Sequence, residues 1–270
     1  MTERPWQLQL LRRSLKKKEK LKLLDKVLTP TAETLILDLG CAQGILSFAL
    51  RMKGGRWIST DLDALNLKTS QNLLHDNLLQ TGPGALPFKD NSFDLIISLD
   101  YLEHLDDDDL CLREIRRVLK NKGELICAVP QTGRCFLIHK LRPLLGISLD
   151  DYGHKREGYT LGGIKQKIQT SGLHYIRHKN FSRSVTELIE LLLNVLYMKI
   201  FKSKREKDLR DGHIRPSTPD EFASKKKAFR LYAFFYPLVW LITRLDKALF
   251  FLKGYALMVW AKKEESKEIT

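Results

Sequence analysis

The stretch Leu35-Ile-Leu-Asp-Leu-Gly-Cys-Ala-Gln-Gly44 decides how the rest of the chain is interpreted. A short apolar run with an acidic residue near its end is typical of a buried strand, and the glycines after it are typical of a tight turn. Residues 45–51 then have helix-compatible spacing and stop before Gly54-Gly55. The sequence therefore predicts a strand, a glycine turn and a helix. Backbone N–H groups in such a turn can approach a ligand at the positive end of the helix.

Two familiar phosphate-binding turns do not match this stretch. The dinucleotide fingerprint has three spaced glycines, whereas here only Gly40 and Gly44 are present, with Ala42 between them. A Walker loop ends in Gly-Lys-Ser/Thr, which is missing. From these residues alone, a purely structural turn in another kind of α/β protein remains an alternative.

A second strand is predicted at residues 56–61, and it ends in Asp61 about 20 positions beyond the turn. In a doubly wound sheet the end of this strand lies beside the first turn, where a carboxylate can accept hydrogen bonds from both hydroxyls of a ribose. Asp61 is therefore the ribose-binding candidate. The alternative is that it merely caps a helix beginning at residues 63–65.

Two later segments carry a family resemblance. Residues 85–105 read Leu-Pro-Phe, then Asn-Ser-Phe-Asp, then a buried strand ending near Glu-His-Leu. Residues 110–120 form an amphipathic helix, followed by a predicted stop at 121–123 and a strand at 124–130. With the first turn, these segments resemble class I S-adenosylmethionine-dependent methyltransferases, in particular the ubiquinone-biosynthesis-like (methyltransferase type 11) branch, over residues 34–130.

The resemblance implies an α/β fold, a Rossmann-like doubly wound sheet of seven strands with the last one antiparallel. Residues 173–181 and 254–262 are similar to the family's last two strands, and the roughly 70 residues between them are an insertion where a short turn suffices. We expect a basic amphipathic helix at 1–30, the methyltransferase core at 31–182, a helical basic and aromatic insertion at 183–252, the last core strand at 253–263 and a tail at 264–270.

The implied cofactor is S-adenosyl-L-methionine. Carried over position by position, the resemblance places its binding residues at the ends of the first, second and fourth strands and in the loop before the fourth. They are Asp38, Gly40, Cys41, Ala42, Gln43, Gly44, Asp61, Leu62, Leu86, Leu99 and Asp100.

The chain departs from the family pattern at two positions. Ala42 replaces the usual middle glycine, which we expect to be tolerated if φ there is negative. The family's acidic residue after the third strand is Thr81 or Gly82 here, so an adenine contact falls to the backbone near Ala85 or Leu86.

Catalytic residues are not identified by the sequence. The acceptor is expected near residues 131–159, after the fifth strand, where this type of fold binds ligands. The titratable candidates are His104, His139, Tyr152, His154 and Tyr159, and each has a structural role as its main alternative. No metal site is expected, because the run Asp106–Asp109 diverges around a helix start and suits the positive end of the helix dipole.

The composition indicates a folded protein with an anionic partner. The formal net charge of the 270 residues is +14. Cys41, Cys111, Cys127 and Cys135 have no metal-ligand or paired spacing, which favours a reducing, cytoplasmic location. Lysines and arginines run through the N-terminal segment, so we expect no signal peptide there.

The cations border apolar runs at residues 1–28 and 184–252. Aromatic residues and leucines flanked by lysine clusters are what an interfacial element on an anionic membrane carries, whereas neither apolar run is long enough for a membrane span. We therefore expect peripheral association with the inner face of a membrane. The alternatives are a solvated helix at the domain edge, an ordinary helical cap, or a homodimer surface.

The interpretation from sequence is methyl transfer to a lipophilic or membrane-associated small molecule, such as a quinone precursor or another lipid. Three alternatives stay open: methylation of a soluble metabolite or polysaccharide intermediate, methylation of RNA, and a non-catalytic membrane-associated scaffold that retains the fold. RNA is disfavoured because phosphate-tracking surfaces intersperse cations with polar residues and separated stacking aromatics.

Overall fold

The computed structural model describes residues 5–133, 137–201, 219–249, 251 and 253–265. Cys135 and residues 202–218 of the predicted insertion lie outside this part of the chain. The strands are β1 (Leu35–Leu39), β2 (Arg56–Asp61), β3 (Leu78–Gln80), β4 (Phe93–Leu99), β5 (Leu119–Pro130), β6 (His174–Phe181) and β7 (Ala256–Lys262). The helices are α1 (Trp6–Arg13), α2 (Leu15–Asp25), α3 (Ile45–Arg51), α4 (Ala64–Leu74), α5 (Asp108–Val118), α6 (Leu137–Leu144), α7 (Leu161–Thr170), α8 (Ser184–Phe201), α9 (Pro219–Ser224) and α10 (Lys226–Thr243), with the short 3-10 helices η1 (Leu102–His104), η2 (Asp150–Tyr152) and η4 (Arg244–Lys247).

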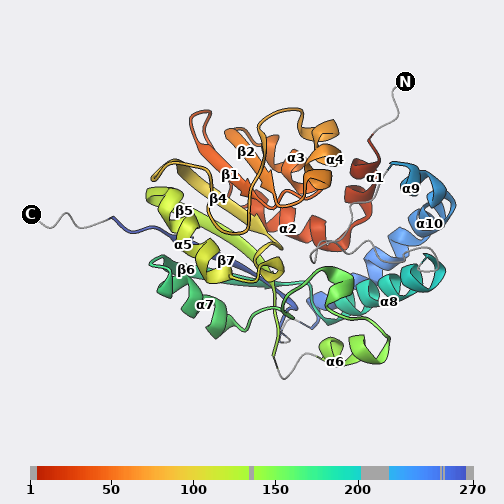
Figure 1. Ribbon diagram of the computed structural model, residues 1–270. Helices are drawn as coiled ribbons and strands as arrows, with labels where there is room; N and C mark the ends of the chain where they lie inside the picture. The colour runs from red at the N-terminus through yellow and green to blue at the C-terminus, as the bar shows by residue number, and fades with distance from the viewer. Residues whose placement is uncertain (1–4, 134–136, 202–218, 250, 252, 266–270) are drawn as a thin grey trace, which may run out of the picture.

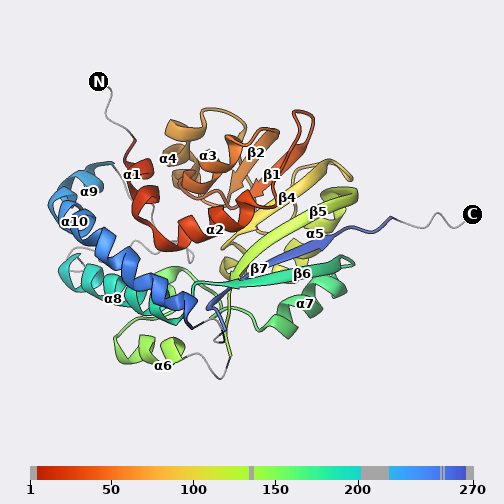
Figure 2. The same ribbon diagram turned by 180° about the vertical axis from the view of Figure 1, so that it is seen from behind.

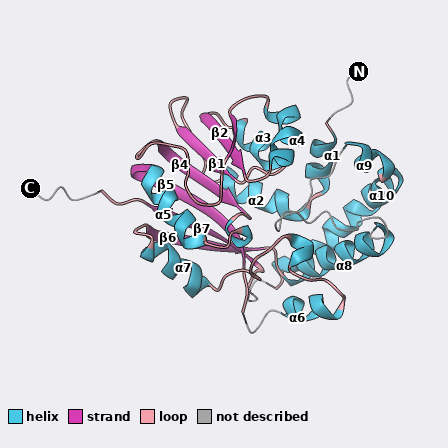
Figure 3. Ribbon diagram, in the orientation of Figure 1, coloured by secondary structure: helices cyan, strands magenta, loops and turns pink. Residues whose placement is uncertain are grey.

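One sheet runs through the molecule in the order β3-β2-β1-β4-β5-β7-β6 (Figure 3). β1 pairs in parallel with β2 and β4, whereas β7 is antiparallel to both β5 and β6. The predicted fold class is confirmed, including the antiparallel last strand.

Both faces of the sheet are covered by helices (Figures 1 and 2). On one face, alternate strand residues such as Leu37 and Ile96 pack with Leu112 of α5 and Ile164 of α7. On the other, the intervening residues pack with Leu24 of α2 and with residues of α3. Strands buried on both faces explain why β1 and β4 read as continuous apolar runs rather than alternating ones.

One helix was predicted for the N-terminal segment, but the structure has two, α1 and α2. Ser14 has an extended backbone between α1 and α2, and its hydroxyl accepts a hydrogen bond from Lys17 N at 3.4 Å. Serine is a good N-cap because its side chain replaces a missing helical acceptor. The break at Ser14 therefore divides the predicted helix at 1–30 into α1 and α2.

The predicted stop at residues 121–123 is also wrong. α5 ends at Val118, and β5 begins at once with Leu119, which pairs with Phe93 across a register shift in the β4–β5 ladder. Near the start of β5, Lys122 N donates to the Lys263 carbonyl, and Lys263 N donates to the Gly123 carbonyl. Lys263 directly follows β7. Tertiary pairing at the sheet therefore overrides the local turn signal of Asn-Lys-Gly.

The insertion between β6 and β7 forms α8, α9 and α10, which lie beside α1 in Figures 1 and 2. The N-terminus of α8 is capped by a residue distant in sequence. The Asp246 carboxylate accepts hydrogen bonds from Val185 N and Thr186 N at 2.8 and 3.0 Å. Glu187, in the first turn of α8, accepts from the Ser182 hydroxyl at 2.8 Å. Within the residues that the structure describes, no helix has the length and apolar character needed to cross a membrane.

A glycine substitution tests the packing between β5 and the loop before α7. Gly158 has φ +136°, and a Cβ there would lie 2.4 Å from the Pro130 carbonyl oxygen. We expect Gly158→Ala to lower the free energy of unfolding by about 3 kcal/mol, because strain and overlap add. Chemical denaturation measures the change.

The matched control is Gly162→Ala in α7, where no heavy atom lies within 4 Å of the added Cβ. Alanine has a higher helix propensity than glycine, so the same experiment should show that Gly162→Ala raises the free energy of unfolding by about 0.5–1 kcal/mol. Equal effects at the two positions would contradict the close packing of this loop against Pro130.

Candidate functional site

The glycine turn lies between β1 and α3, at the edge where the parallel strands end. The N–H groups of Gly40 and Cys41 both donate to the Thr60 carbonyl, at 2.9 and 2.8 Å, which ties the turn to the end of β2. Gly40 has φ +86°, and a Cβ on it would lie 2.5 Å from the Tyr101 ring. A side chain is therefore excluded at this point of the turn.

Ala42 adopts a left-handed backbone with φ +47°, so the condition under which alanine replaces the middle glycine without strain is not met. An L-residue with a Cβ is strained by about 1 kcal/mol in this region, which explains why glycine is the usual residue there. The conformation is held by a hydrogen bond, because Ala42 N donates to Asp61 Oδ2 at 2.7 Å.

Asp61 connects the turn to α4. Its Oδ1 accepts from Asp63 N and Asn66 Nδ2, both at 3.0 Å, and its Oδ2 accepts from Ala42 N. A carboxylate has about four acceptor sites, so these three bonds leave one on Oδ2 for a ligand hydroxyl. The role of capping α4 belongs to Asp63, whose Oδ1 accepts from Leu65 N at 2.8 Å. The ribose role of Asp61 stays a prediction.

Asp38 is buried inside β1 and does not face solvent. Its Oδ2 accepts from the Ser59 hydroxyl at 2.9 Å. Burial raises the pKa of this carboxyl to about 6, although hydroxyl donors from Ser47 and Ser59 oppose the rise. This side chain therefore braces the strand end behind the turn.

The remaining cofactor candidates differ in exposure. Cys41 is buried, and burial raises the pKa of its thiol far above its usual range, so it is not a nucleophile at neutral pH. Gln43 and Leu62 are half-buried. Leu99 is buried at the end of β4.

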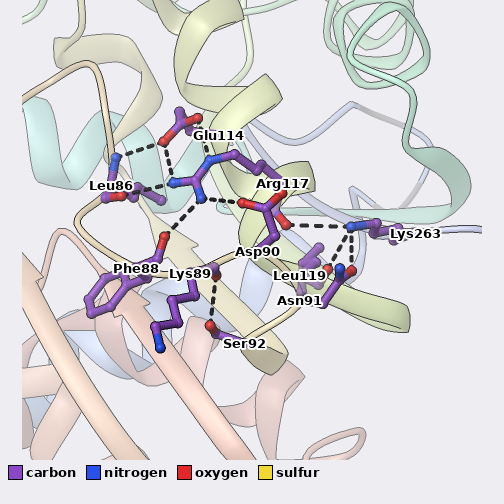
Figure 4. A network of polar contacts seen from close by, with 10 residues as sticks. All are labelled: Leu86, Phe88, Lys89, Asp90, Asn91, Ser92, Glu114, Arg117, Leu119 and Lys263. Carbon is purple, nitrogen blue, oxygen red and sulfur yellow. Dashed lines mark hydrogen bonds and ion pairs between the residues drawn. The ribbon is translucent and has the colours of Figure 1, made fainter.

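The loop that carries Leu86 is held by a polar network (Figure 4). Leu86 N donates to Glu114 Oε2 at 2.8 Å, and its carbonyl accepts from Arg117 Nη2 at 2.9 Å. Arg117 also binds Asp90 and the Phe88 carbonyl. Both backbone groups of Leu86 are thus engaged, which leaves the exposed Ala85 as the better candidate for a backbone contact with adenine.

Asp100 follows β4 with a left-handed backbone, φ +52°, and forms an ion pair with the buried Lys20 of α2. Burial alone would raise the pKa of Asp100, but the neighbouring Lys20 ammonium outweighs it and lowers the pKa below its usual value. The N-terminal segment therefore reaches the edge of the sheet next to the glycine turn. No pattern in the sequence indicates this contact.

Three of the five catalytic candidates lie together just beyond β4. The rings of His104 and His154 are 4.8 Å apart between centroids, and those of Tyr152 and His154 are 5.6 Å apart. His104 Nδ1 lies 2.8 Å from the Gly153 carbonyl. Burial lowers the pKa of His154 to about 3, so this imidazole is neutral at physiological pH.

The other two candidates do not join this cluster. Tyr159 is buried, and its hydroxyl donates to Asp108 Oδ2 at 2.7 Å. His139 is buried with Nε2 2.9 Å from the Gln131 carbonyl. Both contacts join loops to the core. Asp108, from the acidic run, also binds Arg156 and Lys167 at 2.9 and 3.0 Å.

Glu103 is the residue that sequence reasoning passed over. It is fully buried next to His104, and among the described residues neither of its carboxylate oxygens has a hydrogen-bond partner. Single ligand atoms of Glu103, His104 and His154 lie within 4.8 Å of one another. In the sequence, the only sign of this cluster is the adjacent pair Glu103 and His104 shortly after β4. Their partner His154 is 50 residues beyond His104, and only the fold brings it close to them.

An apolar cavity of about 450 Å³ lies beside the glycine turn. Gln43 and Ile45 line it from the turn, and the rest of its wall comes from α1, α8, α9, α10 and the residues next to them. These include Trp6, Leu10, Leu193, Phe222, Phe229 and Tyr232, with Arg13, Lys17 and Glu190 as charged members.

The strand order, the antiparallel β7 and the glycine turn after β1 define the fold of the class I methyltransferases. In agreement, residues 37–127 match a family model described as a methyltransferase domain, which confirms the resemblance for that segment. The match covers about a third of the chain.

Curated relatives match the same region. An uncharacterized protein of Methanocaldococcus jannaschii is 39% identical over 115 residues, which are 41% of this chain and 47% of the relative. The ubiquinone/menaquinone biosynthesis C-methyltransferase UbiE of Hahella chejuensis is 34% identical over 34% of this chain and 41% of the relative. The chain thus spans less than half the length of these relatives.

Among solved structures, the [4+2]-cyclase SpnF is similar with a TM-score of 0.59 and 14% identity. The alignment covers 92% of this chain and 81% of SpnF. At this identity the likeness shows the fold alone.

The pKa of Asp38 predicts a pH dependence of stability. The pKa is 3.8 for the free group and about 6 in the folded chain, so between these values the folded state binds more protons than the unfolded one. As pH rises through this window, the wild-type protein should lose about 3 kcal/mol of unfolding free energy relative to Asp38→Asn and then level off above pH ~7.

Urea denaturation of both proteins between pH 4 and 8 measures this difference. A constant offset between the two curves is expected from the altered hydrogen bonds to Ser59. Parallel curves across the whole window would show that Asp38 titrates normally in the folded state.

Proposed function

We propose that this chain is an S-adenosyl-L-methionine-dependent methyltransferase that acts on a lipophilic acceptor at an anionic membrane surface. The observation that carries the cofactor assignment is the bond between Asp61 and Ala42 N, which places a carboxylate with one remaining acceptor site beside the glycine turn. The methyltransferase-domain match over the same residues supports it.

In the proposed reaction the chain acts mainly by positioning. The sulfonium of the cofactor makes its methyl carbon electrophilic, so the acceptor must be held in line with the carbon–sulfur bond. Asp61 holds the ribose, and the turn residues from Gly40 to Gly44 hold the rest of the cofactor at the start of α3. If the acceptor is a hydroxyl, a base is also needed.

The cavity beside the turn supports a lipophilic acceptor. Leucine and aromatic side chains form much of its wall, which also includes Gln43 of the glycine turn and Ile45 at the start of α3. Its volume of about 450 Å³ suits part of a lipid or a prenylated ring rather than a polymer. The similarity to UbiE, which is named for ubiquinone and menaquinone biosynthesis, points to the same class of acceptor.

The exposed face of α10 supports a membrane partner. Its large apolar side chains are accessible to solvent, which is unusual for so many neighbours on one helix. They are Leu231, Phe234, Phe235, Leu238, Trp240, Leu241, Ile242 and, just beyond the helix, Leu245. Their arrangement is what an interfacial helix needs for partial burial among lipid headgroups.

A cationic groove of about 520 Å³ runs between α2 and α10, beside this apolar face. We call it the basic groove, and it is lined by Lys18, Lys22, Lys26, Arg183, Arg244 and Lys247 together with Tyr236 and Trp240. None of these cations forms an ion pair with a residue in the described ranges.

The two carboxylates of the basic groove are engaged elsewhere. Glu19 accepts from Ser182 N at 2.9 Å, and Asp246 accepts from the first amides of α8. The six cations that line the groove outnumber its two carboxylates, so the groove carries an excess of positive charge that anionic headgroups would balance.

Cofactor binding is tested by calorimetry with S-adenosylmethionine and S-adenosylhomocysteine. We expect micromolar binding that Asp61→Ala weakens at least tenfold, because the variant removes the ribose acceptor and releases Ala42 N. The matched control is Asp63→Ala, which removes only the cap of α4 and should bind as the wild type does. No binding by the folded wild-type protein would leave a non-catalytic scaffold as the better account.

Membrane binding is tested by flotation with phosphatidylcholine vesicles that do or do not contain phosphatidylglycerol. The wild type should bind only the anionic vesicles, and Lys22→Glu, Lys26→Glu and Lys247→Glu combined should weaken binding at least tenfold, since each cation contributes about 1 kcal/mol. Lys68→Glu, Lys89→Glu and Arg113→Glu combined make the same change in net charge on other exposed elements. An equal loss of vesicle binding in both triple variants would mean that the basic groove is not the surface that contacts the membrane.

The reaction itself needs a product assay, because the same fold is found in a [4+2]-cyclase. Transfer of labelled methyl groups from the cofactor into a membrane lipid extract should be seen with the wild type and not with Asp61→Ala. Full activity on a water-soluble acceptor without vesicle binding would argue for the soluble-metabolite alternative.

A further inference from the structure

Glu103 presents a chemical problem that the proposed function does not solve. Its side chain is fully buried at η1, and both carboxylate oxygens lack a hydrogen-bond donor among the described residues. The neighbouring cation Lys20 is paired with Asp100 instead. A buried carboxylate without a donor is costly, so such a group normally has an ion or another partner beside it.

His104 presents a second ligand atom toward the same point. Its Nδ1 lies 2.8 Å from the Gly153 carbonyl, so Nδ1 carries the proton and Nε2 carries the lone pair. A backbone carbonyl that fixes the tautomer in this way is the usual support of a metal-binding histidine.

His154 is brought to the pair by a clamped loop. The residue before it, Gly153, bonds His104 through its carbonyl, and the residue after it, Lys155, donates its N–H to the Glu103 carbonyl at 2.9 Å. The loop is thus tied to η1 on both sides of His154. The Nδ1 atom of His154 is buried and has no hydrogen-bond partner in the described part of the structure.

We propose that Glu103, His104 and His154 bind a divalent transition-metal ion. One atom from each residue lies within 4.8 Å of the others. Ligand atoms bonded to one ion at about 2.1 Å lie no more than about 4 Å apart, so small side-chain movements would bring the three onto a shared ion. Two imidazoles and one carboxylate favour Zn²⁺ or Mn²⁺ over Mg²⁺ and Ca²⁺, which prefer oxygen ligands alone. The metal cation supplies the positive charge that compensates the buried Glu103 carboxylate.

The place of the site in the fold suggests its use, and this part rests on the proposed function. η1 directly follows β4, at the sheet edge that carries the glycine turn. Three protein ligands leave coordination positions open. An acceptor oxygen bound there would be oriented toward the methyl group and would lose its proton to water more readily.

Metal binding is tested on the full-length, tag-free protein after treatment with a chelator. Calorimetric titration with MnCl₂ and, separately, ZnCl₂ should show one ion per chain, and mass spectrometry of the reloaded protein should find the same ratio. Glu103→Gln and His154→Gln should each weaken binding at least tenfold. His174→Gln, at an exposed histidine on β6, is the matched control and should bind as the wild type does.

Circular dichroism shows whether each variant is folded. If the buried Glu103→Gln does not fold, the half-buried His154→Gln decides the question. Binding that is undiminished in folded variants, or absent in the folded wild type, would overturn the metal site.

The role of the ion is tested separately from the cofactor site. Chelated wild-type protein should still bind S-adenosylhomocysteine, should lose methyl transfer, and should regain it with Mn²⁺ or Zn²⁺. Full transfer by the chelated protein would overturn the role, whereas failure to bind S-adenosylhomocysteine in every sample would count against the proposed function instead.

Discussion

The hydrogen bond from Ala42 N to the Asp61 carboxylate is the contact on which the candidate site depends. It holds a residue with a Cβ in a left-handed conformation, and it joins the turn after β1 to the end of β2. The same carboxylate accepts from Asp63 N and Asn66 Nδ2, so the start of α4 is fixed as well. One buried side chain therefore sets the geometry of the turn and offers the remaining acceptor site to a ligand.

α2 joins this site to the helices of the insertion. Lys20 pairs with Asp100 at the sheet edge, and Glu19 accepts a hydrogen bond from Ser182 N just after β6. Lys16 pairs with the buried Glu187 of α8 at 2.6 Å. Lys22 and Lys26, from the same segment, line the basic groove. The basic groove and the edge of the sheet beside the glycine turn are thus connected through a single short helix.

Much of the fold could be predicted from sequence, because β1 and β4 are largely apolar runs and Gly40 marks a turn that excludes a side chain. The break at Ser14 and the early start of β5 were missed, since each depends on contacts distant in sequence. In the site, the position of Asp61 could be predicted from the strand order. The positive φ of Ala42 could not, because it depends on the hydrogen bond from Ala42 N to Asp61. The Glu103, His104 and His154 cluster could not be predicted, because only the folded loop after η2 brings His154 to η1.

The most direct test of this account is a crystal structure of the protein with S-adenosylhomocysteine. The account predicts the ribose within hydrogen-bonding distance of Asp61 Oδ2, the adenine against the loop at Ala85, and the sulfur facing the residues that follow β4. Ligand bound at another edge of the sheet, or a ribose that makes no contact with Asp61, would contradict it.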